Sequence, residues 1–357
     1  MENDTLALHL DTTNTENLAL FICGLMTPNI AKYKFFHVFF CYINPIVATA
    51  GLIFNTISLE ILRCSGLNKP STILLFSLVL TDSLHLLITL NFSKFVLFFG
   101  PNGEATYDHC YYIYGLELNY FLAFSSNLFQ FLGSWGRHVG SWIPLFITIE
   151  RILAIFMPIT FKSFVTPKRS IIVVIALFLF WLPYTIVIAC YYKILPETFN
   201  GVSYVSLYYN DFLLENLALI EDVQHWVADP LLSWFPLTFV TLGCTVLIIK
   251  IRLALSKRRT LTSTQKSVTW SPRTTRTLLL TCLIFATTHS AASFLLYFYY
   301  QSGQLAIDLY NRNNLIFFFL NVNASSNLIV YISSNRKLFR IMLNIFHIRK
   351  KTKSLKE

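Results

Sequence analysis

The stretch IERILAIFMP at residues 149–158 places an acid and an arginine together at the end of a long apolar segment. Charged side chains are costly beside hydrocarbon, and those that occur there usually serve a function. Six further apolar segments accompany this one along the chain. We therefore expect Glu150 and Arg151 to lie at one face of a bundle of membrane helices.

The composition is typical of a membrane protein. The 357 residues are 55% hydrophobic and only 13% charged, with a mean hydropathy of +0.56, whereas soluble domains carry about 25% charged residues. Apolar runs of about 18 or more residues predict spanning helices, and an open sheet cannot satisfy its backbone in lipid. We predict an all-α membrane protein, a seven-transmembrane helix bundle. The predicted spans are Phe35–Leu62, Thr72–Leu97, Phe121–Phe156, Ser170–Val187, Trp226–Ile251, Thr277–Tyr299 and Leu315–Ile332.

The basic residues predict the orientation of the bundle. Most Lys and Arg residues fall in three connecting segments and the C-terminal tail, which share one face if seven helices alternate. By the positive-inside rule this face is cytoplasmic and the N-terminus is extracellular. The net charge of +10 is thus an orientation signal and requires no nucleic acid. We expect a multi-pass plasma-membrane protein with an extracellular segment at 1–34, the bundle at 35–334, and an amphipathic helix with a short cytoplasmic tail at 335–357.

Two covalent features are expected on the outer side. Asn3 begins an Asn-Asp-Thr sequon, which predicts glycosylation. Cys110 and Cys190 both fall near the outer face, where oxidation is permitted, and a disulfide between them is plausible. Cys23 is a competing partner, and the sequence leaves the connectivity open. The cysteines show no metal-ligand spacing, so no metal is predicted.

Polar residues inside three spans predict a buried polar cluster. Asn55 lies in the first span and Asp82 in the second, where a carboxylate is a functional candidate by default. Asn323 and Asn327 are four residues apart in the seventh span and therefore share a helix face. Together these side chains can hold water or a structural sodium ion, and no other cofactor is expected. For Asn55, simple hydrogen bonding between helices is the alternative.

The order of these motifs resembles that of the rhodopsin-like (class A) G protein-coupled receptors. The matching elements are Gly-x3-Asn ending at Asn55, Leu-x3-Asp ending at Asp82, Glu-Arg-Ile at 150–152 followed by Pro158, Pro236 in the fifth span, and Asn-x3-Tyr from Asn327 to Tyr331. Each motif is weak alone, but their order on successive spans is specific and covers about residues Phe35 to Phe339. The loose fit is similar to that of divergent invertebrate peptide or chemosensory receptors.

The resemblance implies roles at the cytoplasmic end. Glu150 would hold Arg151 at rest, and Arg151 would turn into the cavity opened when the sixth helix swings outward. Tyr331 would rotate inward to support it. Ile159 matches the apolar side chain that family members insert into the heterotrimeric G protein. The alternative for Glu150 and Arg151 is a simple interfacial ion pair.

The chain also departs from the family pattern. His289 occupies the aromatic switch position of the sixth span, and Ala291 replaces the usual proline two residues later. Without that proline the helix keeps its backbone hydrogen bonds and should kink less. Leu328 replaces the proline of the seventh-span motif, and Cys244 stands where a tyrosine often supports the active state. These changes predict atypical activation and leave constitutive signalling open.

Arg137 and His138 mark the expected ligand site. They lie 14 and 13 residues before Arg151, roughly 20 Å above the cytoplasmic end at 1.5 Å per residue, a level that the family's ligand cavity reaches. Arg137 requires an anion, and two alternatives remain: it receives a ligand carboxylate or carbonyl, or it forms a permanent bridge to Asp229. His138 and His289 either contact the ligand or are ordinary buried histidines.

Two substitutions limit the class of ligand. Gly133 stands where aminergic receptors carry an aspartate, which disfavours amines. Asn321 stands where opsins carry their Schiff-base lysine, which disfavours retinal, and we include it in the predicted ligand set.

Three functions remain in competition. The acidic outer face concentrates cationic partners, which favours a receptor for a basic peptide, and chemosensation of a small molecule is the second hypothesis. An ion or solute transporter is the third, although the two halves show no obvious repeat or paired broken helices. No paired catalytic carboxylates, nucleophile elbow or phosphate loop is evident, so we predict that the protein is not an enzyme.

Overall fold

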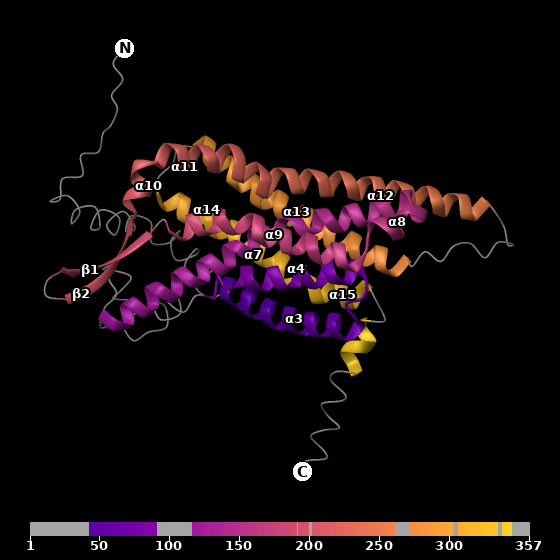
Figure 1. The fold of residues 1–357 in the computed structure, drawn as a ribbon, viewed down its shortest axis with the longest axis horizontal. Helices are drawn as coiled ribbons and strands as arrows, with labels where there is room; N and C mark the ends of the chain where they lie inside the picture. Colours follow the sequence, from indigo (N-terminus) through magenta and orange to yellow (C-terminus); the bar gives the residue numbers. More distant parts are fainter. Residues whose placement is uncertain are drawn as a thin grey trace, which may run out of the picture.

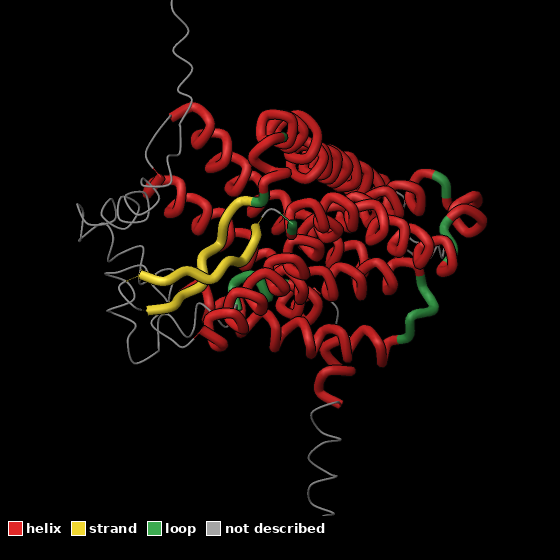
Figure 2. Tube along the Cα trace, turned by 60° about the vertical axis from the view of Figure 1, so that its left-hand side comes forward, coloured by secondary structure: helices red, strands yellow, loops and turns green. Residues whose placement is uncertain are grey.

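A computed structural model describes residues 43–90, 116–190, 192–199, 202–260, 272–302, 306–334 and 338–344. Long helices lie side by side along the longest axis, and a two-stranded hairpin extends from one end (Figures 1 and 2). We call this the hairpin end. The opposite end, where the longest helix stops after Arg151, is the Arg151 end.

The helices correspond to the seven predicted spans. Their bounds are α3 Asn44–Ser65, α4 Pro70–Leu86, α7 Leu116–Phe156, α9 Pro167–Ala189, α12 Phe235–Thr260, α13 Pro272–Ser302, and α14 Ala306–Ser325 followed by α15 Asn327–Ser334. Within the residues that the structure describes, five segments are long and apolar enough to cross a membrane, and the shorter apolar helices Pro70–Leu86 and Leu279–Leu295 supply the other two. The prediction of an all-α membrane bundle is confirmed.

Proline residues set several helix boundaries. Pro residues open α3, α4 and α9, where the missing N–H costs nothing because the first turn has no acceptor for it. Pro158 ends α7 and opens the short helix α8 Pro158–Phe164. At the start of α9, the hydroxyl of Thr166 accepts a hydrogen bond from the Arg169 backbone N–H at 3.3 Å. The turn between α7 and α9 is therefore encoded locally.

The third span is unusually long. Helix α7 has 41 residues, which corresponds to about 60 Å at 1.5 Å per residue, whereas the hydrocarbon core is about 30 Å thick. Its first turns extend toward the hairpin (Figure 1). Pro144 lies inside the helix, and the Thr148 hydroxyl donates to the Pro144 carbonyl at 2.8 Å.

Glycines allow α4 and α7 to approach closely. A Cβ on Gly136 would lie 2.6 Å from the Thr81 backbone oxygen, and one on Gly133 would clash with the Ile88 side chain. Small residues at such interfaces let helix backbones pack directly against each other. This contact brings the α4 residues Asp82 and His85 beside α7, and it positions the functional site.

The last two spans differ in continuity. Helix α13 runs without interruption from Pro272 to Ser302, as Ala291 in place of the usual proline predicts. The seventh span is interrupted at Ser326 although Leu328 also replaces a proline. The Ser326 hydroxyl donates to the Asn323 carbonyl at 2.7 Å, and its N–H donates to the same oxygen at 3.1 Å. A serine turn therefore breaks this helix without proline.

The segment between the fourth and fifth spans contains a feature that the sequence analysis did not predict. Strands β1 Tyr192–Phe199 and β2 Val202–Tyr209 pair antiparallel, from Tyr192 opposite Tyr209 to Phe199 opposite Val202. The expectation of helices throughout was wrong here because the hairpin lies at the end of the bundle, where the constraint of a lipid environment does not apply. The connecting pair Asn200-Gly201 is the sequence signal that was missed, since Asn-Gly is typical of two-residue hairpin turns.

Two short helices, α10 Asp211–Glu215 and α11 Leu217–Val223, connect the hairpin to the fifth span. That span runs from Gln224 to Leu253 and begins with two π-helical segments, η3 Gln224–Ala228 and η4 Pro230–Trp234. After the seventh span, residues 338–344 are helical, with Leu338 buried in the core and Arg340 exposed. This apolar–polar division is that of an amphipathic surface helix.

Candidate functional site

A buried polar cluster joins α3, α4 and α15. The Asn327 side-chain amide donates to the Asp82 carboxylate at 2.7 Å and to the Asn55 side-chain oxygen at 3.4 Å. The Asn55 amide donates in turn to the Ala324 carbonyl at 3.1 Å. All three predicted side chains are buried, so the spans are linked by hydrogen bonds around one carboxylate.

Asn323 does not share in this cluster. In the described part of the chain its carbonyl accepts from Ser326, and its side chain makes none of the cluster's hydrogen bonds. Asn321 has a separate set of partners, because its amide donates to the Asn44 side chain and to the Thr89 hydroxyl, the latter at 2.8 Å. Since Asn321 is fully buried, these bonds use its donors to hold α14 against α3 and against the turn that follows α4.

A second cluster surrounds Arg137 on α7. The guanidinium carbon lies 5.8 Å from the centre of the Phe317 ring. The imidazole of His85 stacks against the same ring, with centroids 6.4 Å apart and planes 19° apart. Arg137, Phe317 and His85 thus form a stack contributed by α7, α14 and α4, which we call the Arg137 stack.

His85 was missed in the sequence analysis. Its side chain is only 4% exposed, and neither ring nitrogen has a hydrogen-bond partner among the described residues. The available signal was its spacing from Asp82: three residues apart on a helix places both side chains on one face. Because Asp82 and His85 share a face of α4, this spacing would have added the second span to the site predicted around Arg137.

The two other predicted histidines differ in their surroundings. His289 packs against Phe285 with ring centroids 4.0 Å apart, and it interacts electrostatically with Arg137 and His85. It therefore borders the Arg137 stack. His138 is buried against α9, where its Nδ1 lies 3.2 Å from the Thr185 hydroxyl and its ring packs on Trp181. This is the environment of a packing residue.

Asp229 lies between the two π-helical segments and is half-buried. It interacts electrostatically with Arg137. Single π turns occur frequently at functional sites. The Arg137 guanidinium also lies against the aromatic ring of Phe317.

At the Arg151 end, Glu150 and Arg151 form a loose pair. The closest approach is 3.8 Å between Arg151 Nη2 and Glu150 Oε1, although the side chains are only 15% and 4% exposed. Charge-assisted hydrogen bonds normally measure about 2.7–2.9 Å. Arg151 Nε and Nη2 and Glu150 Oε2 have no hydrogen-bond partner among the described residues. The acid and the base are thus buried together without firm mutual binding.

Thiol and hydroxyl groups from three helices meet in one cluster near Arg151. The Cys282 sulfur on α13 lies 3.6 Å from the Thr148 hydroxyl on α7. Cys282 also interacts with Cys244 on α12 and, electrostatically, with Arg151. This contact joins the fifth and sixth spans where the resemblance predicts movement.

Tyr331 and Ile159 occupy contrasting positions. Tyr331 is fully buried, and its hydroxyl has no hydrogen-bond partner in the described ranges. Ile159, on α8, is 91% exposed. One polar group is thus enclosed without a partner, and one large apolar group projects beyond the bundle.

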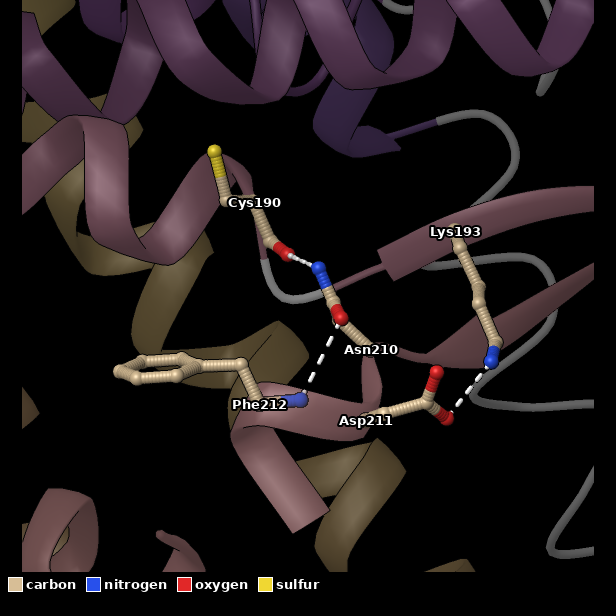
Figure 3. Close-up of polar contacts among 5 residues, drawn as sticks. All are labelled: Cys190, Lys193, Asn210, Asp211 and Phe212. Carbon is tan, nitrogen blue, oxygen red and sulfur yellow. Dashed lines mark hydrogen bonds and ion pairs between the residues drawn. The ribbon is translucent and has the colours of Figure 1, made fainter. Parts of the chain in front are cut away.

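The hairpin is fastened to the bundle through Asn210 (Figure 3). Its side-chain amide donates to the Cys190 carbonyl at 3.4 Å, and its side-chain oxygen accepts from the Phe212 N–H at 3.3 Å. Lys193 forms an ion pair with Asp211 at 2.7 Å. Cys190 is exposed and is not bonded to another of the described cysteines. Cys110 and Asn3 lie outside the described residues, so the disulfide and the glycan stay predictions.

Comparison with known proteins identifies the family. A model described as "Serpentine type 7TM GPCR chemoreceptor Srw" matches residues 42–345. A probable G-protein coupled receptor of Caenorhabditis elegans is 24% identical over 228 residues, which are 62% of this chain and 48% of that protein. The chain thus spans about half the length of that relative. Because the family consists of receptors, the prediction that the protein is not an enzyme is confirmed. The chain belongs to the Srw family of serpentine seven-transmembrane G protein-coupled chemoreceptors.

Proposed function

We propose that the protein converts the binding of a small molecule within the bundle into activation of a heterotrimeric G protein at the Arg151 end. The observation that carries this proposal is the loosely held Arg151 inside the bundle, with exposed Ile159 directly beyond it. A buried guanidinium with unsatisfied donors can change partners at little cost. An isolated exposed isoleucine gains by entering an apolar pocket on a partner.

A small molecule is favoured over the basic peptide predicted from the acidic outer loops. The matching family is described as one of chemoreceptors, which supports the chemosensory alternative. The transporter hypothesis has no comparable support. The finer assignment to the rhodopsin-like class, and the orientation with an extracellular N-terminus and a cytoplasmic C-terminus in the plasma membrane, rest on the motifs and on the distribution of basic residues.

Ile159 provides the test of coupling. We expect Ile159→Glu to weaken receptor-promoted nucleotide exchange by about 30-fold, the effect of losing a contact worth about 2 kcal/mol at the centre of an interface. The measurement is GTP loading of purified heterotrimers of each Gα class by the full chain in lipid vesicles, with and without small odorant molecules. Thr160→Glu is the control, since it adds the same charge to the next exposed residue. Absence of exchange by the unmodified receptor with every heterotrimer would overturn the proposed function.

We also propose that the cluster around Asp82 holds a sodium ion. The Asp82 carboxylate and the Asn55 side-chain oxygen both accept hydrogen bonds from the Asn327 amide, so two oxygens lie close together, and oxygen is the ligand that hard cations prefer.

Sodium binding predicts a salt-specific stabilisation of the receptor. Purified receptor should melt at a higher temperature in NaCl than in choline chloride of equal concentration, because ligand binding to the folded state stabilises it. Asp82→Asn should remove this difference, since it deletes the charged ligand and keeps the side-chain shape. An equal sodium effect in the variant would show that the ion binds elsewhere or acts nonspecifically.

A further inference from the structure

The short helix α8 carries Ile159 but has little packing of its own. It comprises only the seven residues Pro158–Phe164, and an isolated helix shorter than about 12–15 residues is at best marginally stable in water. Among its described side chains Phe161 is partly buried and the others are exposed. Burial of apolar surface therefore contributes little to α8, and the helix depends on the hydrogen bonds at its two ends.

The N-terminal end of α8 is fixed by its connection to α7. The Met157 N–H donates to the Leu153 carbonyl at 2.9 Å, and the Phe161 N–H donates to the Met157 carbonyl at 2.8 Å. These bonds continue from the last turn of α7 into the first turn of α8. The C-terminal end has no such continuation, because the last carbonyls of a helix have no partner within it and must accept from a donor elsewhere.

Arg169 supplies that donor from the first turn of α9. Its Nη1 donates to the Ser163 carbonyl and to the Phe164 carbonyl, each at 2.9 Å. A cationic side chain at this end also interacts favourably with the helix dipole. The backbone N–H of the same residue donates to the Thr166 hydroxyl that caps α9. Arg169 thus joins the end of α8 to the beginning of α9.

We infer that Arg169 is a positioning residue for G protein coupling, because it holds α8 in the helical conformation that presents Ile159 to the G protein. This inference rests on the proposed function, which assigns Ile159 to that contact. Helix formation is cooperative, so a helix of seven residues forms or unwinds largely as one unit. Loss of the hydrogen bonds at its C-terminal end therefore also loosens Ile159 near the other end.

The first experiment tests whether Arg169 holds α8. Amide hydrogen exchange of the full-length receptor in lipid vesicles, followed by mass spectrometry of peptides covering residues 157–165, reports the local opening of this helix. Arg169→Met keeps most of the apolar stem and removes the donors. We expect the amides of Phe161 and Val165 to exchange about fivefold faster in this variant, the value of one net hydrogen bond.

The matched control is Lys168→Met, which removes the same charge from the adjacent exposed residue of α9. Its α8 amides should exchange at the rate of the unmodified receptor. Unchanged exchange in Arg169→Met would overturn the inference. Equally accelerated exchange in both variants would also overturn it, since the effect would then be one of charge alone.

The second experiment tests whether the effect of Arg169 acts through Ile159. In the nucleotide-exchange assay, Arg169→Met should raise the half-saturating concentration of heterotrimer by about fivefold, the same net hydrogen bond, and leave the maximal rate and the melting temperature unchanged. In an Ile159→Ala background the same substitution should have an effect of less than about twofold, because residues that act through one contact are not additive.

The outcomes of this cycle are distinct. A fivefold effect in both backgrounds would show that Arg169 acts without Ile159 and would overturn the inference. A lower melting temperature or a lower maximal rate with an unchanged half-saturating concentration would indicate a general structural role and would also overturn it.

The two readouts separate this inference from the proposed function. Hydrogen exchange in α8 requires no G protein, so an unchanged rate in Arg169→Met overturns the positioning role while coupling through Ile159 stands. A receptor that activates no heterotrimer overturns the proposed function and the positioning role with it, even where Arg169→Met accelerates exchange in α8.

Discussion

Replacement of Arg151 by alanine is expected to abolish G protein activation while leaving the receptor at the cell surface. The proposed mechanism requires the guanidinium to leave Glu150 and to enter the space between the helices that receives the G protein. Alanine removes every donor that could make this exchange. Nucleotide exchange should therefore fall to that of membranes without the receptor, measured beside surface labelling of the same cells.

The stability of this variant follows from the geometry of the pair. Breaking a tight buried ion pair costs about 3–5 kcal/mol, which would prevent folding in many proteins. Here the closest contact is 3.8 Å and two guanidinium nitrogens have no partner among the described residues, so much less is lost. Arg63→Ala is the control: its ion pair with Glu60 measures 3.7 Å but is exposed, with Arg63 76% accessible. Unchanged exchange in Arg151→Ala would reject the assigned role, and loss in Arg63→Ala would indicate a general effect of charge.

Joining Cys244 to Cys282 by a disulfide is expected to block signalling. The two thiols interact between α12 and α13, close to Thr148 and Arg151. The proposed mechanism moves α13 away from its neighbours, and a covalent bond at this position prevents that movement. Treatment of membranes with copper phenanthroline and oxygen converts two thiols into a disulfide, with oxygen taking up the two electrons and the two protons. Nucleotide exchange should fall to the background level and recover after dithiothreitol.

The matched control is Cys244→Ser, which cannot form the bridge and should be insensitive to oxidation. Cys64 is an exposed thiol elsewhere, and it remains in this variant to report nonspecific oxidation. Peptide mapping establishes whether the bridge has formed. A receptor that carries the bridge and still activates the G protein would show that α12 and α13 do not need to separate at this level.

Much of the fold could be predicted from the sequence because lipid imposes simple rules. Long apolar runs must be helical, so the predicted spans and the observed helices coincide closely, as for Ser170–Val187 and α9. The contact between Asp82 and Asn327 was predictable for the same reason. A buried carboxylate such as that of Asp82 needs a hydrogen-bond donor, and few spans carry a polar side chain at the same depth in the bundle.

Other features depend on local chemistry that hydropathy does not report. The break at Ser326 results from the serine hydroxyl, which donates to the Asn323 carbonyl in competition with the helical hydrogen bond to that oxygen. The two hydrogen bonds are nearly equal in energy. The sequence signal for the hairpin is the pair Asn200-Gly201, which a hydropathy profile does not register. His85 is an ordinary residue by composition, and its isolation from hydrogen-bond partners appears only when α4, α7 and α14 are placed together.

The long helix α7 carries Arg137 in one half and Arg151 in the other, and Pro144 lies between them. A proline inside a helix has no N–H to donate to the carbonyl four residues earlier, which here belongs to Gly140. The rod is therefore weakest against bending at this level, between the two arginines. A movement of α7 near Arg137 can therefore reach Arg151 in two ways, as a rotation of the whole helix about its axis or as a bend between Gly140 and Pro144. The flexibility of the helix between these two residues determines how much of the movement is rotation and how much is bending.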